Sequence, residues 1–300
     1  MKRFKNILAV YSGAVGDDDA LTHATTLAKR NDARLTVIEV IKDVAAFPAH
    51  VTERQKHLSR LATSMVQEGI KVEEIVFVGT PFLQIVRQVL RENHDLVIMA
   101  ADSSSGSRNL FFGSTSMHLM RKCPCPVWIV NPGQSPNYAR ILAAVDPSHD
   151  DVSADELNIK ILDLATSLAH LNQSELHIVH AWDLTGKDLD TIRSELTEEA
   201  RNLLVRKNEL MRRKPLESLL ERYALEDLQY HIHLVRGEPE FLIPEMIKQK
   251  KIDLIVMGTV VRTGIPGFFI GNTAELVLRQ VKCAVLTVKP EGFVTPVTFE

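Results

Sequence analysis

A pattern that could bind phosphate lies in the second half of this 300-residue chain. Gly258 and Gly271 bound a loop that follows an apolar run, and Asn272 and Thr273 begin the helical segment after it. Glycines at the ends of such a loop let backbone N–H groups approach a phosphate, and the helix N-terminus adds its dipole. Asp146 ends an earlier apolar run, where an acidic residue can hold ribose hydroxyls. Glycines also make tight turns, so a purely structural role stays open.

Catalytic motifs do not accompany this pattern. The sequence contains no GxxxxGK[ST], no GxSxG and no HExxH. Apart from Asp146, we recognise no general base or acidic metal ligand. We therefore expect no catalytic residues and a protein that acts by binding. A weak ATP-hydrolysing or phosphate-transferring enzyme is the alternative.

The histidines do not predict a metal site. His177 and His180 lie at positions i and i+3 of a strand-like run, so their side chains point to opposite faces of a sheet and cannot share one ion. His231 and His233 lie in another apolar, strand-like run. We expect no bound metal, with zinc at these histidines as the alternative.

The chain contains two copies of one pattern. Three pairs of segments align at a single offset of 158 residues: 76–86 with 234–244, 94–100 with 252–258, and 113–132 with 271–290. Near the start of each copy, 7–12 aligns with 141–146 at an offset of 134, so the second copy carries 24 additional residues. Repetition of this kind predicts two domains of one fold.

Each copy alternates short apolar runs with helical segments. The expected strands are 7–11, 35–40, 72–77, 96–99 and 127–130 in the first copy, and 141–145, 175–181, 229–235, 253–257 and 284–288 in the second. Expected helices of the first copy are 17–30, opened by capping aspartates, 51–68, 81–93 and 114–121. Continuous Val, Ile and Leu runs indicate strands buried on both faces. The sequence therefore predicts an α/β protein of two tandem doubly wound domains, each a five-stranded parallel sheet with helices on both faces, which is a Rossmann-like fold.

The expected domain boundaries follow from the repeat. We predict domain 1 at 1–132, a linker at 133–138, domain 2 at 139–290 and a C-terminal tail at 291–300. The additional residues of the second copy lie mostly in 183–227, which is rich in Glu, Lys, Arg and Leu. This composition favours a longer helix with a solvated face, and a lid over the site is the alternative.

Composition favours a cytoplasmic protein without nucleic-acid or membrane partners. A net charge of −3 and a pI near 6.4 argue against nucleic-acid binding, and no apolar stretch is long enough to span a membrane. Three cysteines, an odd number, fit a reducing compartment. Cys123 and Cys125 form a C-x-C pair at a strand entrance, and Cys125 and Cys283 occupy equivalent positions, which suggests packing.

The first copy has lost the phosphate pattern. Ala100 and Ser103 stand at the positions of the first two glycines, and Ser12 stands at the position of the aspartate. Asp102 adds a carboxylate to the loop that would face the phosphates. Losing two charge-assisted hydrogen bonds, each worth about 1.5–3 kcal/mol, weakens triphosphate binding about a hundredfold or more. We therefore expect no cofactor in domain 1.

The second copy resembles the universal stress proteins. That family carries Gly-x2-Gly-x9-Gly-(Ser/Thr) after its fourth strand, and the second copy has GTVVRTGIPGFFIGNTAE at 258–275. It departs from this pattern at Val261, which replaces the middle glycine, and at Asn272, which replaces the first Ser/Thr. The segments GTV-x-RTGI and GNTAE of the second copy, and HDLV and LMRKCPCPVWIV of the first copy, are similar to the corresponding segments of tandem members of the UspE type. The resemblance covers about residues 3–298.

The resemblance implies a fold like that of adenine-nucleotide α-hydrolases and a role in the stress response, with ATP as the expected cofactor of domain 2. Its implied cofactor-binding residues are Asp146, Ala181, Gly258, Gly271, Asn272 and Thr273. The fifth strands of the two domains are expected to pair as a pseudo-dimer within the chain, which could also form a homodimer. An alternative function is a carrier of an apolar or lipid-like metabolite in domain 1, where Phe111 and Phe112 could line a pocket or belong to the core.

Overall fold

The computed structural model describes residues 3–42, 47–101, 112–147, 152–184, 197–259 and 271–299. The first half contains β1 (Asn6–Tyr11), α1 (Asp17–Asn31), β2 (Arg34–Ile41), α2 (Pro48–Gln67), β3 (Val72–Val78), α3 (Pro81–Glu92), β4 (Leu96–Ala100), α4 (Ser114–Lys122) and β5 (Val127–Val130). The second half contains β6 (Arg140–Ala144), α5 (Val152–Asn172), β7 (Glu175–Trp182), α7 (Glu198–Leu220), β8 (Tyr230–Arg236), α8 (Pro239–Lys250), β9 (Leu254–Gly258), α9 (Asn272–Leu278) and β10 (Ala284–Val288).

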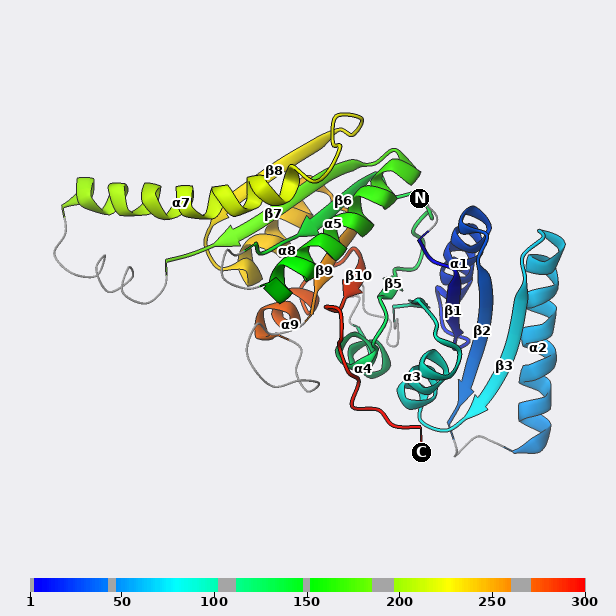
Figure 1. Cartoon of the computed structure of the whole chain (residues 1–300). Coiled ribbons are helices and arrows are strands. Elements are labelled where there is room, and N and C mark those ends of the chain that lie inside the picture. The colour runs from blue at the N-terminus through cyan, green and yellow to red at the C-terminus, as the bar shows by residue number, and fades with distance from the viewer. Residues whose placement is uncertain are drawn as a thin grey trace.

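The described strands form one continuous sheet in the order β3-β2-β1-β4-β5-β10-β9-β6-β7-β8 (Figure 1). Within each half all neighbouring strands run parallel, and the strand order reverses at β1 and at β6. This topology confirms the predicted α/β fold of two tandem doubly wound domains with five parallel strands each.

Apolar side chains pack in two layers, one on each face of the sheet. Helices α1, α2, α5 and α7 contribute to one layer, with Leu27, Leu58, Leu162 and Leu216 among the buried residues. Helices α3, α4, α8 and α9 contribute to the other, with Ile85, Leu119, Ile243 and Val277. Because each layer contains residues from both domains, the two halves share their cores rather than meeting at a polar boundary.

The two domains are joined edge to edge through their fifth strands, as predicted. Strands β5 and β10 pair antiparallel, with Trp128 opposite Leu286. Side chains reinforce this junction, since Arg121 Nη2 lies 2.8 Å from Glu275 Oε2. Asn131 Nδ2 donates a hydrogen bond of 2.7 Å to the carbonyl oxygen of Lys282. The chain therefore contains the expected pseudo-dimer.

The N-cap of α1 and the start of α2 differ from the sequence-based expectation, while α1 begins at residue 17 as predicted. The prediction that aspartates cap α1 is wrong: Gly16, with φ of 98°, is the N-cap, and Asp17 is the first helical residue. The loop needs a glycine there because its backbone lies in the left-handed region. Helix α2 begins three residues earlier than predicted, at Pro48, because proline is favoured in the first turn.

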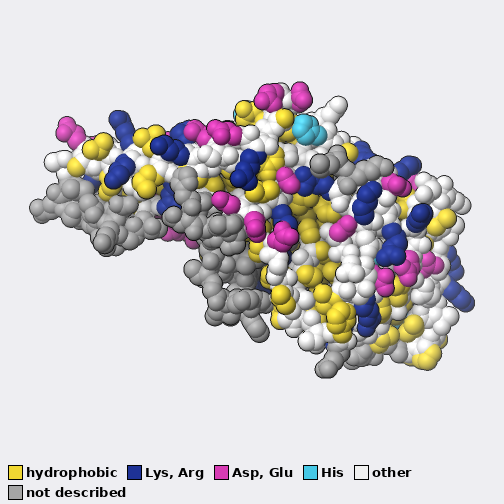
Figure 2. Space-filling view, viewed as in Figure 1, with side chains coloured by type: hydrophobic (Ala, Val, Ile, Leu, Met, Phe, Trp, Pro, Cys, Tyr) yellow, Lys and Arg dark blue, Asp and Glu magenta, His cyan; other side chains and the backbone are white. Residues whose placement is uncertain are grey.

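Helix α7 is the longest described element and extends beyond the sheet (Figures 1 and 2). Thr197 caps it by accepting a hydrogen bond of 3.3 Å from the Ala200 N–H. Its buried residues lie near its C-terminal end: Pro215, Leu216, Leu219 and Leu220. The predicted long helix with a solvated face is therefore confirmed, whereas residues 185–196, where a lid would begin, lie outside the described residues. None of the helices in the described ranges is long and apolar enough to cross a membrane.

Candidate functional site

The candidate site lies where β6, β7 and β9 end. Strand β6 pairs with β7 on one side and with β9 on the other. Ala181 is therefore placed near the end of one neighbouring strand and Gly258 at the end of the other, with Asp146 just beyond β6. The N–H of Gly271 donates a hydrogen bond of 3.0 Å to the carbonyl oxygen of Thr259, so these two residues, which flank positions 260–270, lie next to each other.

Gly258 has a packing reason to be glycine. A Cβ at this position would lie 2.6 Å from Cδ2 of Leu157, so α5 can approach β9 only because no side chain is present. Gly271 is the N-cap of α9 with φ of −61° and ψ of 138°, an extended conformation open to any residue. Asn272 and Thr273 are exposed in the first turn of α9. The purely structural role that the sequence left open for the glycines thus applies to Gly258. Val261 lies outside the described residues.

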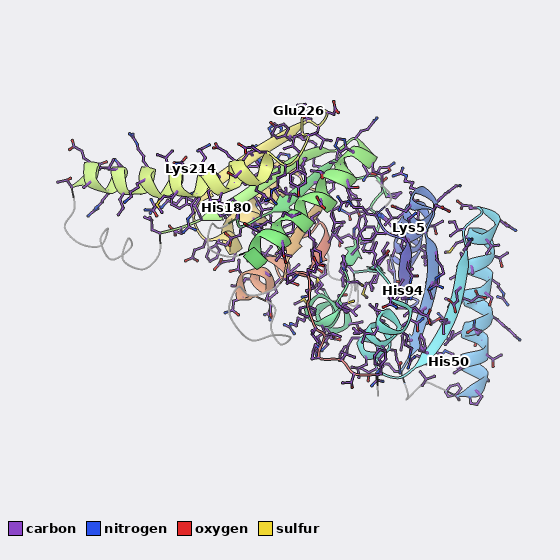
Figure 3. All side chains as sticks on the ribbon, in the orientation of Figure 1. Lys5, His50, His94, His180, Lys214 and Glu226 are labelled. Carbon is purple, nitrogen blue, oxygen red and sulfur yellow. The ribbon has the colours of Figure 1, made fainter. Side chains whose placement is uncertain are left out.

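Asp146 contacts Asn158 and His180, neither of which the sequence analysis assigned to this site. Its N–H donates a hydrogen bond of 2.8 Å to Oδ1 of Asn158 on α5. His180, labelled near the end of β7 in Figure 3, lies beneath it with Nδ1 3.6 Å from Asp146 Oδ1 and 3.3 Å from the Val145 carbonyl oxygen. His180 is 1% exposed and Asp146 is 56% exposed. The sequence signal that could have identified Asn158 is a polar residue on the apolar face of a helix, because such a residue needs a buried hydrogen-bonding partner.

The same place in domain 1 is occupied by a carboxylate of the protein. Asp17 Oδ2 accepts hydrogen bonds from the N–H of Ser12 at 2.7 Å and from the N–H of Ala14 at 2.9 Å. Asp17 is 3% exposed, so its charge is buried against these donors. Asp17 and Asn158 each lie fourteen residues before the last residue of their helix, which makes them equivalent. Domain 2 thus has a neutral amide where domain 1 has a negative charge.

The aromatic and cysteine residues take structural positions. Phe112 packs against the apolar layer of α3, α4, α8 and α9, while Phe111 lies outside the described residues. The thiols of Cys123 and Cys125 are 3.5 Å apart. Burial raises the pKa of the Cys283 thiol to about 12 and also raises that of Cys125, which makes both poor nucleophiles at neutral pH. The interpretation of the cysteines as packing residues agrees with these positions.

The sequence-based argument from the spacing of the histidines applies only within a single strand. His177 and His180 lie apart, as predicted, but the pairing of β7 with β8 brings His177 next to His231 and His233, which the sequence analysis did not foresee. Spacing along one strand carries no information about the neighbouring strand. Within the part of the chain that the structure describes, no group of three or more His, Cys, Asp and Glu side chains is arranged to hold a metal ion.

Comparison with known proteins places the chain in a family. The family model of the Universal stress protein family matches residues 3–131 and 137–289. The chain is 29% identical to Universal stress protein E of Photorhabdus laumondii subsp. laumondii, over 99% of this chain and 98% of that protein. It is 28% identical to Universal stress protein E of Escherichia coli K12, over 100% of this chain and 98% of that protein.

Solved structures agree on the fold. A protein of unknown function from Pseudomonas aeruginosa PAO1 superposes with a TM-score of 0.78 at 24% identity, covering 97% of this chain and 95% of that one. A universal stress protein from Archaeoglobus fulgidus DSM 4304 gives a TM-score of 0.67 at 19% identity, covering 95% and 98%. Because the family model matches both halves, the chain belongs to the Universal stress protein family and carries two of its domains in tandem, in the manner of Universal stress protein E.

Proposed function

We propose that the protein acts in the stress response of the cytoplasm by binding an adenine nucleotide, ATP in the first instance, in domain 2 (139–290). The nucleotide would lie beyond the ends of β6, β7 and β9, against Asp146, Ala181 and Gly258. Domain 1 (1–132) would bind none. The protein would work as a binding protein rather than as an enzyme.

The replacement of Asp17 by Asn158 at equivalent positions is the observation that carries this proposal. In domain 1 the buried Asp17 carboxylate satisfies the N–H donors of the loop after β1 and adds a negative charge. A unit charge about 8 Å from a phosphate charge repels it by roughly 2 kcal/mol at an effective dielectric constant of about 20. In domain 2 the Asn158 amide holds the Asp146 backbone, and the carboxylate at this edge is the exposed one of Asp146, which can accept ribose hydroxyls.

Calorimetric titration of ATP into the full-length chain tests the proposal. Asn158→Asp places the domain 1 charge in domain 2 with almost no change of shape. We expect it to weaken ATP binding at least tenfold, as a repulsion of roughly 2 kcal/mol implies. The matched control is Asp17→Asn, which should leave the affinity of domain 2 unchanged.

Two results would contradict the proposal. Absence of ATP binding to the unmodified chain at millimolar concentration would exclude the nucleotide as ligand. Equal affinity of the unmodified chain and the Asn158→Asp variant would exclude this edge of domain 2 as the place of binding.

A further inference from the structure

A cavity lies at the opposite edge of domain 2 from the candidate nucleotide site, where β6, β7 and β8 begin and α8 ends. It has a volume of about 320 Å³, at the lower end of the range of small-molecule sites. Its lining consists of Arg140, Glu175, His177, His231, Gln249, Lys250 and Lys251. None of these belongs to the proposed nucleotide site, which lies at the other ends of the same strands.

The cavity carries an excess of positive charge. Arg140, Lys250 and Lys251 face a single carboxylate, that of Glu175. Among the described residues, no ion pair involves any of these three cations. The C-terminus of α8 contributes about half a negative charge, so the lining stays positive and favours an anion.

A buried imidazole nitrogen in the lining lacks a hydrogen bond. The His177 side chain is 3% exposed, and its Nε2 lies 3.2 Å from Glu175 Oε1 without hydrogen-bond geometry. Its other ring nitrogen, Nδ1, is engaged 2.9 Å from Nε2 of His233. His231 stacks on His177 with ring centroids 5.0 Å apart. Buried polar atoms are almost always paired, so an unpaired one beside a cavity points to a ligand that supplies the partner.

Domain 1 shows what this edge looks like without such a site. The strand registers make Asn6 equivalent to Arg140 and Arg34 equivalent to Glu175. Glu92 and Asn93 end α3 where Lys250 and Lys251 end α8. In domain 1 Arg34 Nη2 lies 3.5 Å from Glu92 Oε2, so opposite charges neutralise each other there. The positive cavity is therefore a feature of domain 2 and not of the fold.

We propose that this cavity is a second ligand site and that it binds a small phosphate-bearing anion. Arg140 supplies a planar guanidinium that matches two phosphate oxygens, and Lys250 and Lys251 supply point charges. The Nε2–H of neutral His177 donates to the anion in the tautomer whose Nδ1 accepts from His233. Glu175 orients His231, whose Nε2 lies 2.8 Å from its Oε1.

Calorimetric titration of inorganic phosphate into the full-length chain at low ionic strength tests the site. We expect Arg140→Gln/Lys250→Gln to weaken phosphate binding at least tenfold, because two charge-assisted contacts are lost. Glu175→Gln should instead strengthen binding several-fold, because it removes the one negative charge of the lining. The control, Arg34→Gln in domain 1, should leave phosphate binding at this cavity unchanged.

Glu175→Gln is expected to strengthen phosphate binding, whereas Arg140→Gln/Lys250→Gln is expected to weaken it. The proposal can therefore be tested even where the double variant folds poorly. Phosphate binding that is absent, or that neither Arg140→Gln/Lys250→Gln nor Glu175→Gln alters, overturns the proposal. A parallel titration with Zn²⁺ tests whether the cavity binds a metal ion instead of an anion. Tight zinc binding that both Glu175→Gln and His231→Ala abolish, in a chain that does not bind phosphate, would make the cavity a metal site and the proposal wrong.

Discussion

Lys289 is a charged residue that is buried at the junction of the two domains. It directly follows β10 and is 4% exposed. Its Nζ donates a hydrogen bond of 2.7 Å to the Met120 carbonyl oxygen of domain 1 and another to Oγ1 of Thr259. The ammonium group lies 4.9 Å from the centroid of the Phe293 ring. Burial lowers the pKa of Lys289 from its ordinary value of 10.5 to about 7.

This pKa has a defined effect on stability. Between pH 7 and 10.5 the folded chain binds fewer protons than the unfolded chain, so the stability of the folded state rises with pH across this window. At 1.36 kcal/mol for each pH unit, burying the charge costs about 5 kcal/mol at pH 6 and about 2 kcal/mol at pH 9. The contribution of Lys289 should therefore change by about 3 kcal/mol between these two pH values.

Replacing Lys289 by methionine removes the charge without leaving a polar atom unpaired. Oγ1 of Thr259 donates a hydrogen bond of 3.0 Å to the Met120 carbonyl oxygen, so both groups stay satisfied when the ammonium is gone. The methionine side chain has a similar length and can contact the Phe293 ring. We expect Lys289→Met to raise the free energy of unfolding at pH 6 by several kcal/mol, and by about 3 kcal/mol less at pH 9.

Urea unfolding at pH 6 and pH 9 measures this difference, and comparison of variant with unmodified chain cancels the other titrating groups. The control is Lys71→Met at an exposed position, which should show the same small effect at both pH values. A Lys289→Met variant that is less stable at both pH values would mean that the hydrogen bonds of the ammonium outweigh its desolvation. A stability difference independent of pH would show that Lys289 does not titrate in this window.

Two further predictions concern packing and acid stability. Gly258→Ala should lower the free energy of unfolding by about 1–3 kcal/mol, because its Cβ would meet Leu157, whereas Gly271→Ala, at a conformation open to any residue, should change it by less than about 0.5 kcal/mol in the same urea experiment. Burial lowers the pKa of His177 to about 4, so the unfolded chain takes up the proton first and about 3 kcal/mol of stability should be lost as the pH falls from 6.5 to 4. A His177→Gln variant should lack this loss, and an equal acid sensitivity of both proteins would contradict the assignment.

The fold could be predicted because its signals are local or repeated. Continuous apolar runs such as Leu96–Met99 identify strands buried on both faces. The offset of 158 residues shared by three pairs of segments identifies two domains of the same fold. Pairing of the fifth strands followed from family resemblance and was confirmed by the ladder between β5 and β10. The N-cap of α1 was missed because the left-handed backbone of Gly16 is a property of the loop and not of the aspartates after it.

The functional contacts could be predicted only in part. The positions of Asp146 and Gly258 follow from the rule that ligands lie beyond strand ends in an open parallel sheet. The equivalence of Asp17 and Asn158 was hidden because α5, with 21 residues, begins before this position, whereas α1, with 15 residues, begins at it, which shifts the alignment of the two helices. The cluster of His177, His231 and Glu175 depends on the register between two strands, which spacing along either strand does not determine.

The two copies place their charges differently at both edges of the sheet, and domain 2 has the exposed Asp146 where domain 1 has Ser12. At the carboxyl ends of the strands, Asn158 of domain 2 replaces the charge of Asp17. At the amino ends, Arg140, Lys250 and Lys251 replace Asn6, Glu92 and Asn93, which outweighs the change from Arg34 to Glu175. These changes lie on different helices and at opposite ends of the strands, so one local repacking does not explain both. A common cause would be binding of anions by domain 2, while domain 1 supplies a rigid partner that shares its sheet and its two apolar layers.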